Sequence, residues 1–409
     1  MTSDTHAFVW VWLPEATEPV VAGRLDQVGP IFDFVYGRSY LDLPGGLSLY
    51  LPDLPLVEGS ISPIGGAEAP GPILDAGPDA WGQRVIDRRL AGRESFEDLG
   101  LLTYLLEPLS DRIGALDFTR SSSEYVARVS GNQSLDALLT AAEQLDQGLP
   151  LPSGLDEALL HGSSIGGARP KALLDDGDRK LIAKFSSTSD TLPIVQGEFI
   201  AMELARRSGL NVAVVEHTRV LGKEVLLVER FDRTPGGGRR LMVSGTTMFG
   251  LDPRVAARYG SYAELADLVL MRFTDAEATL RELFSRIIFN ILVSNTDDHL
   301  RNQSAFWDGR VLTLTPAYDI TPQSRSGGEA TQAMAIGRDG YRFSRLAGAV
   351  ERATPYHLTL SDARHICDHQ LEVIRRDWDE VCDLAELTKV QRDDLSGRQF
   401  CNPYALEGY

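Results

Sequence analysis

The stretch of sequence that decides the fold is Asn295-Thr296-Asp297-Asp298-His299-Leu300-Arg301-Asn302, which is followed closely by Tyr318-Asp319-Ile320. It places an aspartate, a basic residue and an asparagine in one short segment, with a second aspartate soon after. This order is typical of ATP-dependent phosphoryl transfer, because a carboxylate can orient and deprotonate a hydroxyl nucleophile while amide and carboxylate oxygens hold Mg²⁺. We therefore expect Asp297 to be the base, and Asn302 and Asp319 to be the metal ligands.

The other polar residues of this loop also have predicted roles. Arg301 is close enough in sequence to steady the charge on a transferring phosphoryl group. We expect His299 to brace the loop beside the nucleotide by a side-chain hydrogen bond. The pair Asp297-Asp298 leaves the position of the base open, and the offset to Asn302 favours Asp297.

Apolar elements on either side are expected to position this loop. Residues 281–294 are predicted to form a buried helix that leads into it. Strands at 304–307 and 311–315 are predicted to pair around Asp308-Gly309. Such a hairpin would return Asp319 to the loop, so that two loops converge on one metal site.

Residues 161–185 are expected to form the nucleotide-binding half of the site. A Gly/Ser loop comes first, and it contains Ser163, Ser164, Ile165, Gly166, Gly167 and, at its end, Lys171. Strands at 171–174 and 180–185 are predicted to form a hairpin that carries Lys184. A glycine loop followed by a strand lysine is the order found in kinases. The loop alone is a weak signal, because it is neither a P-loop nor a strict G-x-G-x-x-G.

The next elements suggest partners for this lysine and for a nucleotide base. A helix is predicted over residues 196–208, and Glu198 near its start is the preferred ion-pair partner of Lys184, with Glu203 as the competing choice. Strands at 214–221 and 224–230 follow. We expect Glu229 and Phe231 to lie at the hinge that offers backbone groups to adenine.

Bulk composition bounds the remaining possibilities. A chain of 409 residues is expected to form two or three domains or lobes. The net charge of −18 argues against generic binding to nucleic acid or to anionic membranes. Three cysteines do not make a disulfide framework, and no apolar run approaches the ~20 residues of a membrane span, so a cytoplasmic location is expected. Residues 1–120 show no catalytic constellation.

Together these motifs resemble the HipA-type serine/threonine kinase toxins of bacterial toxin–antitoxin modules. The segments that carry the resemblance are Ser164 to Lys171, Ile182 to Phe185, Val228 to Arg233, Asp297 to Asn302 and Tyr318 to Ile320. In combination they are specific, and separately none is. One departure is Arg301, where the family commonly has lysine, so the reach and fork geometry of a phosphate contact differ.

The resemblance implies an α+β, two-lobed protein-kinase-like fold with an additional N-terminal α+β subdomain and a mostly helical C-terminal lobe. The corresponding segments would be residues 1–125, residues 126–235 with the glycine loop and lysine, and residues 236–409 with the catalytic loop. The implied cofactors are ATP and Mg²⁺. Autophosphorylation of a glycine-loop serine is also implied, at Ser164 or its neighbour Ser163.

The resemblance further implies growth inhibition through phosphorylation of a protein substrate, an aminoacyl-tRNA synthetase in known members. A helix-turn-helix antitoxin similar to HipB is the implied partner, in a homodimer or a toxin–antitoxin assembly, with DNA reached only through the antitoxin. Two other interpretations stay open: a small-molecule kinase of similar fold, and a catalytically silent corepressor that binds a DNA-binding antitoxin.

Overall fold

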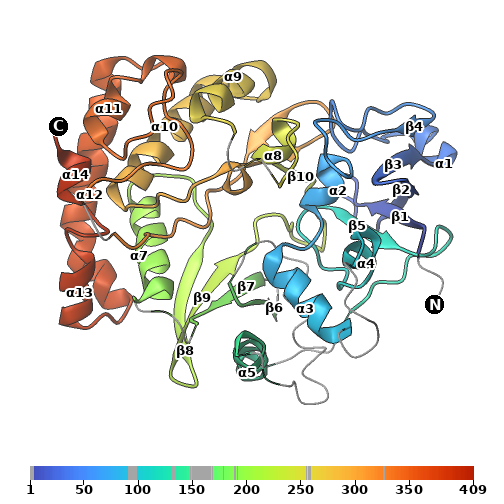
Figure 1. Cartoon of the computed structure of the whole chain (residues 1–409), viewed down its shortest axis with the longest axis horizontal. Coiled ribbons are helices and arrows are strands. Elements are labelled where there is room, and N and C mark those ends of the chain that lie inside the picture. The colour runs from blue at the N-terminus through green and yellow to red at the C-terminus, as the bar shows by residue number, and fades with distance from the viewer. Residues whose placement is uncertain are drawn as a thin grey trace.

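The computed structural model describes residues 4–90, 99–129, 134–147, 149, 167, 169–177, 179–187, 190, 192–254, 256, 259–325 and 328–409. Most of the predicted glycine loop, with Ser163, Ser164, Ile165 and Gly166, lies outside the described residues. Within them the chain forms three antiparallel sheets, and the helices are concentrated in the C-terminal half (Figure 1).

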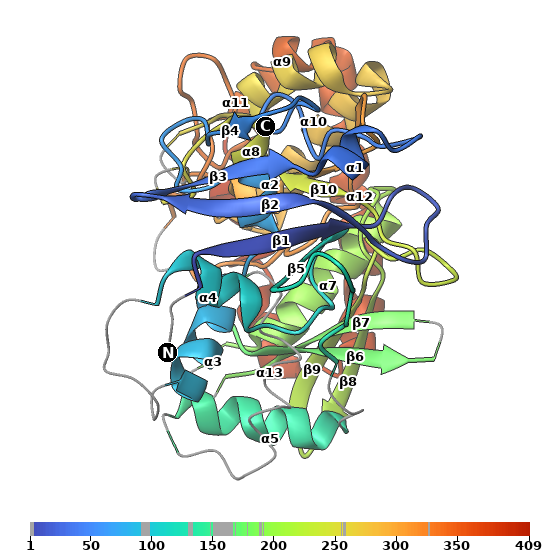
Figure 2. The same cartoon turned by 90° about the vertical axis from the view of Figure 1, so that its right-hand side faces the viewer.

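The N-terminal sheet has the strand order β4-β3-β2-β1-β5. Its strands are β1 (His6–Val11), β2 (Val20–Val28), β3 (Ile31–Tyr36), β4 (Ser60–Ile61) and β5 (Leu116–Thr119). The accompanying helices are α1 (Arg38–Leu41), α2 (Gly71–Asp75), α3 (Ala80–Leu90) and α4 (Leu101–Leu106). In Figure 2 this sheet crosses the front of the molecule, above α3 and α4.

The central sheet has the order β6-β7-β9-β8 and contains both predicted hairpins. Its strands are β6 (Lys171–Asp176), β7 (Arg179–Phe185), β8 (Val215–Val220) and β9 (Lys223–Glu229). Along β7 the side chains alternate, with Leu181, Ala183 and Phe185 fully buried and Lys184 on the opposite face. The buried face packs against α5 (Leu135–Asp146) and Trp81, and α7 (Ile194–Arg207) packs against β8 and β9.

The third sheet, in the order β10-β11-β12, lies within the helical C-terminal part. Its strands are β10 (Met242–Ser244), β11 (Ser304–Trp307) and β12 (Leu312–Leu314), so the predicted hairpin around Gly309 is confirmed. The surrounding helices are α8 (Gly245–Met248), α9 (Tyr262–Arg272), α10 (Ala276–Leu292), α11 (Leu346–Val350), α12 (Leu360–Leu384), α13 (Lys389–Leu395) and α14 (Pro403–Leu406). Helix α10 begins before the predicted residue 281, because the Asp275 side chain accepts a hydrogen bond from the Ala278 N–H and caps it there.

One hydrophobic core joins the N-terminal sheet to the C-terminal helices. It runs from Val9 and Phe34 in that sheet, through Leu226 in β9, to Phe284 and Ile374. The architecture is an α+β fold, in which the central sheet and the helical part meet at α7, β9 and the loops around β11 and β12. Each sheet falls within one of the three predicted segments. Among the described residues, no helix has the length and apolarity that crossing a bilayer requires.

Candidate active site

Three separate elements meet at Lys184. The lysine lies on β7, Glu198 lies on α7, and Asp319 follows β12. Lys184 Nζ is 2.6 Å from Glu198 Oε1 and 2.6 Å from Asp319 Oδ1. Glu203, the competing partner, instead pairs with Arg206 and Arg207 of its own helix. The structure thus brings together a lysine and two carboxylates that are far apart in the sequence.

The three groups differ in exposure to solvent. The side chains of Glu198, Lys184 and Asp319 are 5%, 15% and 44% exposed. Lys184 lowers the pKa of Asp319 to about 2, so this carboxylate is charged at neutral pH. Burial opposes a charge on Lys184, but Asp319 and Glu198 outweigh that effect and raise the pKa of the ammonium. Glu198 therefore holds Lys184 from the protein interior, and Asp319 is the member of the cluster that is accessible to solvent.

Asp319 adopts a backbone conformation that non-glycine residues rarely use. Its φ is 59°, in the left-handed region, which costs on the order of 1 kcal/mol or more. The preceding residues hold it there: the Ala317 N–H donates to Asn211 O at 2.8 Å, and the Tyr318 hydroxyl donates to Arg301 O at 2.8 Å. Strain that neighbours enforce in this way is typical of a functional position.

Gly167 and Lys171, the described end of the glycine loop, lie against this cluster. Lys171 is buried, and burial together with the nearby Lys184 charge lowers its pKa to about 8. Gly167 has a φ of +107°, and an added Cβ would collide with Lys171 Nζ. The backbone conformation therefore favours glycine here, and any other residue would also displace the Lys171 ammonium.

The structure separates the two adjacent aspartates of the catalytic loop. Asp298 is 3% exposed and accepts hydrogen bonds from the Tyr262 hydroxyl at 2.5 Å, from Asn290 Nδ2 at 2.8 Å and from Gln303 Nε2 at 2.8 Å. Burial raises the pKa of Asp298. Asp297 is exposed. Of the two carboxylates, Asp297 is accessible to a substrate and Asp298 supports the loop from inside.

The remaining loop residues are placed as follows. Asn302 lies in a short 3-10 turn, and its N–H donates to His299 O at 2.9 Å. His299 Nδ1 is buried and has no hydrogen-bond partner among the described residues, so the predicted bracing bond is not present at this atom. The Arg301 side chain, 48% exposed, forms an ion pair with Asp79 of the N-terminal part.

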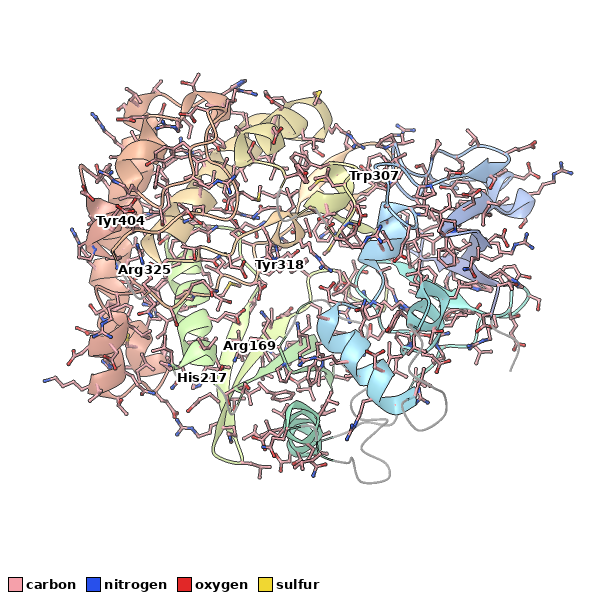
Figure 3. The ribbon with its side chains drawn as sticks, in the orientation of Figure 1. Arg169, His217, Trp307, Tyr318, Arg325 and Tyr404 are labelled. Carbon is pink, nitrogen blue, oxygen red and sulfur yellow. The ribbon has the colours of Figure 1, made fainter. Side chains whose placement is uncertain are left out.

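Glu229 and Phe231 lie where the central sheet passes into the C-terminal part. The Glu229 N–H donates to Val214 O at 2.8 Å and the Arg230 N–H to Lys180 O at 2.9 Å, so both donors are engaged within the sheet. The Phe231 ring packs against the ring of Tyr318 at a centroid distance of 5.7 Å. Tyr318 is labelled near the centre of Figure 3, between the sheet and the helical part.

The residues next to this hinge tie it to the N-terminal sheet. Arg230 is fully buried and donates to Asp111 at 3.0 Å, to Asp232 at 2.8 Å and to the carbonyl of Arg112. Burial alone would raise the pKa of Asp232, but Arg230 and Arg233 lower it to about 2. Much of the segment Val228 to Arg233, one of the segments that carry the resemblance, is thus a structural junction.

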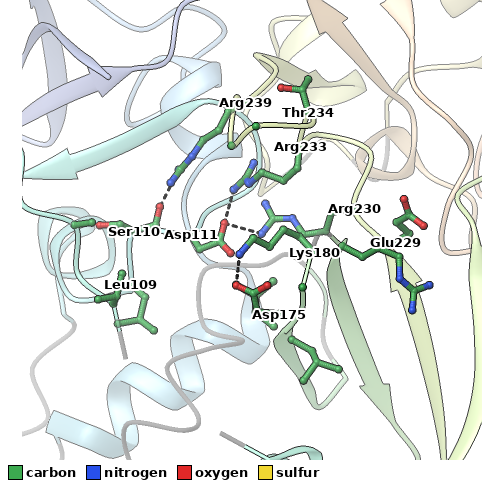
Figure 4. A pocket seen from close by; sticks show the side chains of 18 of the residues that line it. Leu109, Ser110, Asp111, Asp175, Lys180, Glu229, Arg230, Arg233, Thr234 and Arg239 are labelled. Atoms are coloured by element: carbon green, nitrogen blue, oxygen red, sulfur yellow. Dashed lines mark hydrogen bonds and ion pairs between the residues drawn. The ribbon is translucent and has the colours of Figure 1, made fainter. Parts of the chain in front are cut away.

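A cavity of about 1020 Å³ lies at this junction (Figure 4). Its cationic side chains pair with neighbours: Lys180 with Asp175, and Arg233 with Asp111. Of the predicted site residues, its lining contains Glu229 alone. The predicted phosphate-contacting residues Lys171 and Lys184 therefore lie outside this cavity.

The chemistry of the cluster around Lys184 fits a metal-bound triphosphate. Asp319 in the cluster and Asn302 in the neighbouring loop have the hard oxygen donors that Mg²⁺ prefers, and Lys184 and Lys171 supply positive charge for phosphate. The unpartnered Nδ1 of His299 provides a polar atom that a ligand can satisfy.

Asp79 is the residue that the sequence did not indicate. Residues 1–120 showed no catalytic motif, yet Asp79 contacts both Arg301 and the Gly167 N–H. Its only sequence signal was Pro78-Asp79 at a helix start, which is also the signal of an ordinary helix cap.

Comparison with known proteins identifies the family. Residues 163–378, more than half of the chain, match the family described as HipA-like C-terminal domain. The fold and this match define a kinase-like protein of the HipA class, and the chain belongs to the HipA-like C-terminal domain family.

Individual relatives agree with this assignment. The chain is 30% identical over 174 residues to "Putative kinase Y4mE" of Sinorhizobium fredii, and this match covers 38% of this chain and 41% of that protein. It is 28% identical over 145 residues to "Serine/threonine-protein kinase toxin HipA" of Shewanella oneidensis, which covers 31% and 34%. The matched regions thus span about a third to two fifths of these curated relatives.

A solved structure matches almost the whole chain. It is a chain of the Shewanella oneidensis MR-1 complex of HipA, HipB and operator DNA, with a TM-score of 0.71. The match covers 95% of this chain and 93% of that one at 19% sequence identity, so it establishes the fold alone.

Proposed function

We propose that this chain is an ATP- and Mg²⁺-dependent serine/threonine protein kinase. The observation that carries the proposal is the position of Lys184 Nζ, 2.6 Å from both Glu198 Oε1 and Asp319 Oδ1. A lysine held by a helix glutamate beside a metal-binding aspartate is the arrangement that phosphoryl transfer requires. Family membership and the kinase names of its relatives support the same conclusion.

Each residue of the site has a proposed role. Asp297 orients the acceptor hydroxyl and takes its proton, because it is the accessible carboxylate of the loop. Lys184 and Lys171 bind phosphate oxygens, and Arg301 steadies the charge of the transferring group. Asn302 and Asp319 would hold Mg²⁺, which supplies charge neutralisation of the triphosphate when bound.

We also propose contacts for the adenine base and for the loops. Phe231 and the Glu229 carbonyl contact adenine at the hinge, since the N–H groups of Glu229 and Arg230 are engaged in the sheet. Glu198 keeps Lys184 in place. His299 faces the bound nucleotide, which satisfies its buried Nδ1 atom. The proposed nucleotide contacts of the glycine loop are Ile165, Gly166 and Gly167, of which Gly167 is the one among the described residues.

The biological role that best fits is the toxin of a toxin–antitoxin pair. Support comes from the toxin name of the Shewanella oneidensis relative and from the matched structure, which is a complex with HipB and operator DNA. The proposed partner is a HipB-like helix-turn-helix antitoxin, through which DNA is reached, because this chain carries a net charge of −18. The proposed substrate is a translation component such as an aminoacyl-tRNA synthetase.

The test is incubation of the purified chain with Mg²⁺-ATP and host extract, followed by phosphopeptide mass spectrometry. We expect phosphate on serine or threonine of a protein, and its loss in Asp297→Asn and Asp319→Asn. Asp308→Asn is the matched control, because Asp308 is an exposed turn residue of the hairpin between the two loops. Full turnover in Asp319→Asn would remove the metal-ligand assignment.

Self-modification gives a second readout. Ser164→Ala is expected to lose most self-phosphorylation, with Ser163 as the alternative acceptor. A phosphoserine carries nearly two negative charges, and beside a triphosphate these would oppose ATP binding. Undiminished phosphate on a peptide outside residues 161–171 would contradict this assignment.

The same experiment distinguishes the two other functions. Labelled small molecules without labelled protein would identify a small-molecule kinase of this fold. ATP binding without any transfer, combined with retention on a DNA-binding antitoxin, would identify a silent corepressor.

A further inference from the structure

Asp79 links three parts of the molecule. It lies at the start of α3, in the N-terminal part, where the Gln83 N–H donates to its backbone carbonyl at 2.8 Å. Its Oδ2 accepts a hydrogen bond from the Gly167 N–H at 2.7 Å, and its Oδ1 forms an ion pair with Arg301. One carboxylate thus joins the end of the glycine loop to the catalytic loop.

A second residue strengthens the link to the glycine loop. The Trp81 N–H donates to Gly167 O at 3.1 Å, and its indole Nε1 donates to Lys171 O at 3.2 Å. Trp81 is fully buried between α5 and the central sheet. Both backbone polar groups of Gly167 are therefore bonded to residues 79–81, which fixes its peptide planes beside the lysines.

The position of Arg301 also depends on this part of the chain. Burial lowers the pKa of Arg301, and the nearby Asp75 opposes that effect. Asp75 is itself held by Ser244, whose N–H and hydroxyl both donate to it at 2.7 Å. The ion pair with Asp79 and the nearby charge of Asp75 thus restrict a guanidinium that is 48% exposed and would otherwise sample many orientations.

We propose that Asp79 is a positioning residue that acts through Gly167 and Arg301, and that the N-terminal part is consequently an integral component of the ATP site. This inference rests on the proposed function, because it assumes that these two residues face phosphate. With Asp79 in place, Gly167 and Arg301 are ordered before the nucleotide binds, so the binding free energy of the nucleotide is not reduced by the entropy cost of ordering them.

The test uses the purified full-length chain and equilibrium binding of Mg²⁺-ATP, so that it does not depend on turnover. Asp79→Asn keeps an acceptor for the Gly167 N–H but removes the charge that holds Arg301. We expect roughly fivefold weaker ATP binding, within the range found for coupled neighbouring residues. Asp79→Glu restores the charge and should recover part of the affinity.

The matched control is Asp87→Asn. Asp87 lies on the same helix, where it accepts a hydrogen bond from the Tyr104 hydroxyl at 2.8 Å, away from the loops. The ATP affinity of Asp87→Asn should equal that of the wild type. In an Arg301→Gln background, Asp79→Asn should weaken ATP binding by less than twofold, because the partner is already lost.

Three results would overturn the inference. The first is a lower melting temperature for Asp79→Asn with unchanged ATP affinity. The second is tighter ATP binding by Asp79→Asn, which would make Asp79 a competitor of phosphate. The third is full additivity of the effects of Asp79→Asn and Arg301→Gln on ATP affinity. A wild-type chain that binds ATP without transferring phosphate would instead refute the proposed function, and the binding comparison would still decide the role of Asp79.

Discussion

Asp297 and Asp298 are adjacent, and the structure gives them opposite expected phenotypes. Asp298→Ala would leave three donors without their acceptor: the Tyr262 hydroxyl, Asn290 Nδ2 and Gln303 Nε2. All three of these residues are buried, and an unsatisfied buried donor costs about 1–3 kcal/mol. Part of that cost is offset because the three donors can rearrange and because the variant no longer has to bury a carboxylate. We therefore expect a loss of about 3–5 kcal/mol in the free energy of unfolding.

Asp297→Ala removes an exposed side chain instead. Its free energy of unfolding should stay within about 0.5 kcal/mol of the wild-type value. If Asp297 is the base, however, kcat should fall by roughly a hundredfold or more, which is the usual contribution of a positioned general base.

The assay compares urea unfolding at pH 7, followed by circular dichroism, with phosphotransfer by the same two preparations. Each variant serves as the matched control for its neighbour, since both lose the same carboxyl group from one loop. Equal destabilisation of the two, or normal turnover by Asp297→Ala, would refute this division of roles.

Three further predictions follow from single contacts. Burial raises the pKa of Asp53 from 3.8 to about 6, so the stability contributed by its protonated carboxyl group is complete below pH 3.8 and is lost as pH rises through 6. In urea unfolding, the free energy of unfolding of Asp53→Asn should therefore exceed that of the wild type by roughly 2 kcal/mol at pH 8 and by little at pH 4. Gly167→Ala should weaken ATP binding roughly tenfold in calorimetry, because its φ is +107° and the methyl group meets Lys171 Nζ. Glu198→Gln should weaken ATP binding more with Mg²⁺ than with EDTA, because Lys184 would then hold Asp319 as its one carboxylate; equal losses would contradict this.

The elements of the fold that depend on local pattern were predictable from the sequence. The hairpin of β6 and β7 follows from alternating apolar residues around Gly177, and the hairpin of β11 and β12 from the turn at Gly309. The approach of Lys184 to Glu198 was also expected, because helix α7 directly follows the strand that carries the lysine. These features are local, so a short stretch of sequence contains their cause.

What the sequence could not indicate depends on contacts between distant segments. Asp79 contacts Gly167 and Arg301, and nothing near Asp79 in the sequence distinguishes it from a helix cap. Similarly, Arg230 belongs to a motif that suggests a nucleotide hinge, yet its side chain is buried against Asp111 of the N-terminal part. In both cases the partner is specified only by tertiary packing.

The two carboxylates around Lys184 also account for how one site can serve both a lysine and a metal. In the proposed site Asp319, which pairs with the Lys184 ammonium, would also be a ligand for a divalent cation. A buried ammonium with a single carboxylate would resist losing it, since breaking such a pair costs about 3–5 kcal/mol. If Asp319 bound a metal, Lys184 would retain Glu198, the less exposed of its two partners. The buried ammonium would therefore keep a carboxylate, and Asp319, the more exposed of the two, would be the one to bind the metal.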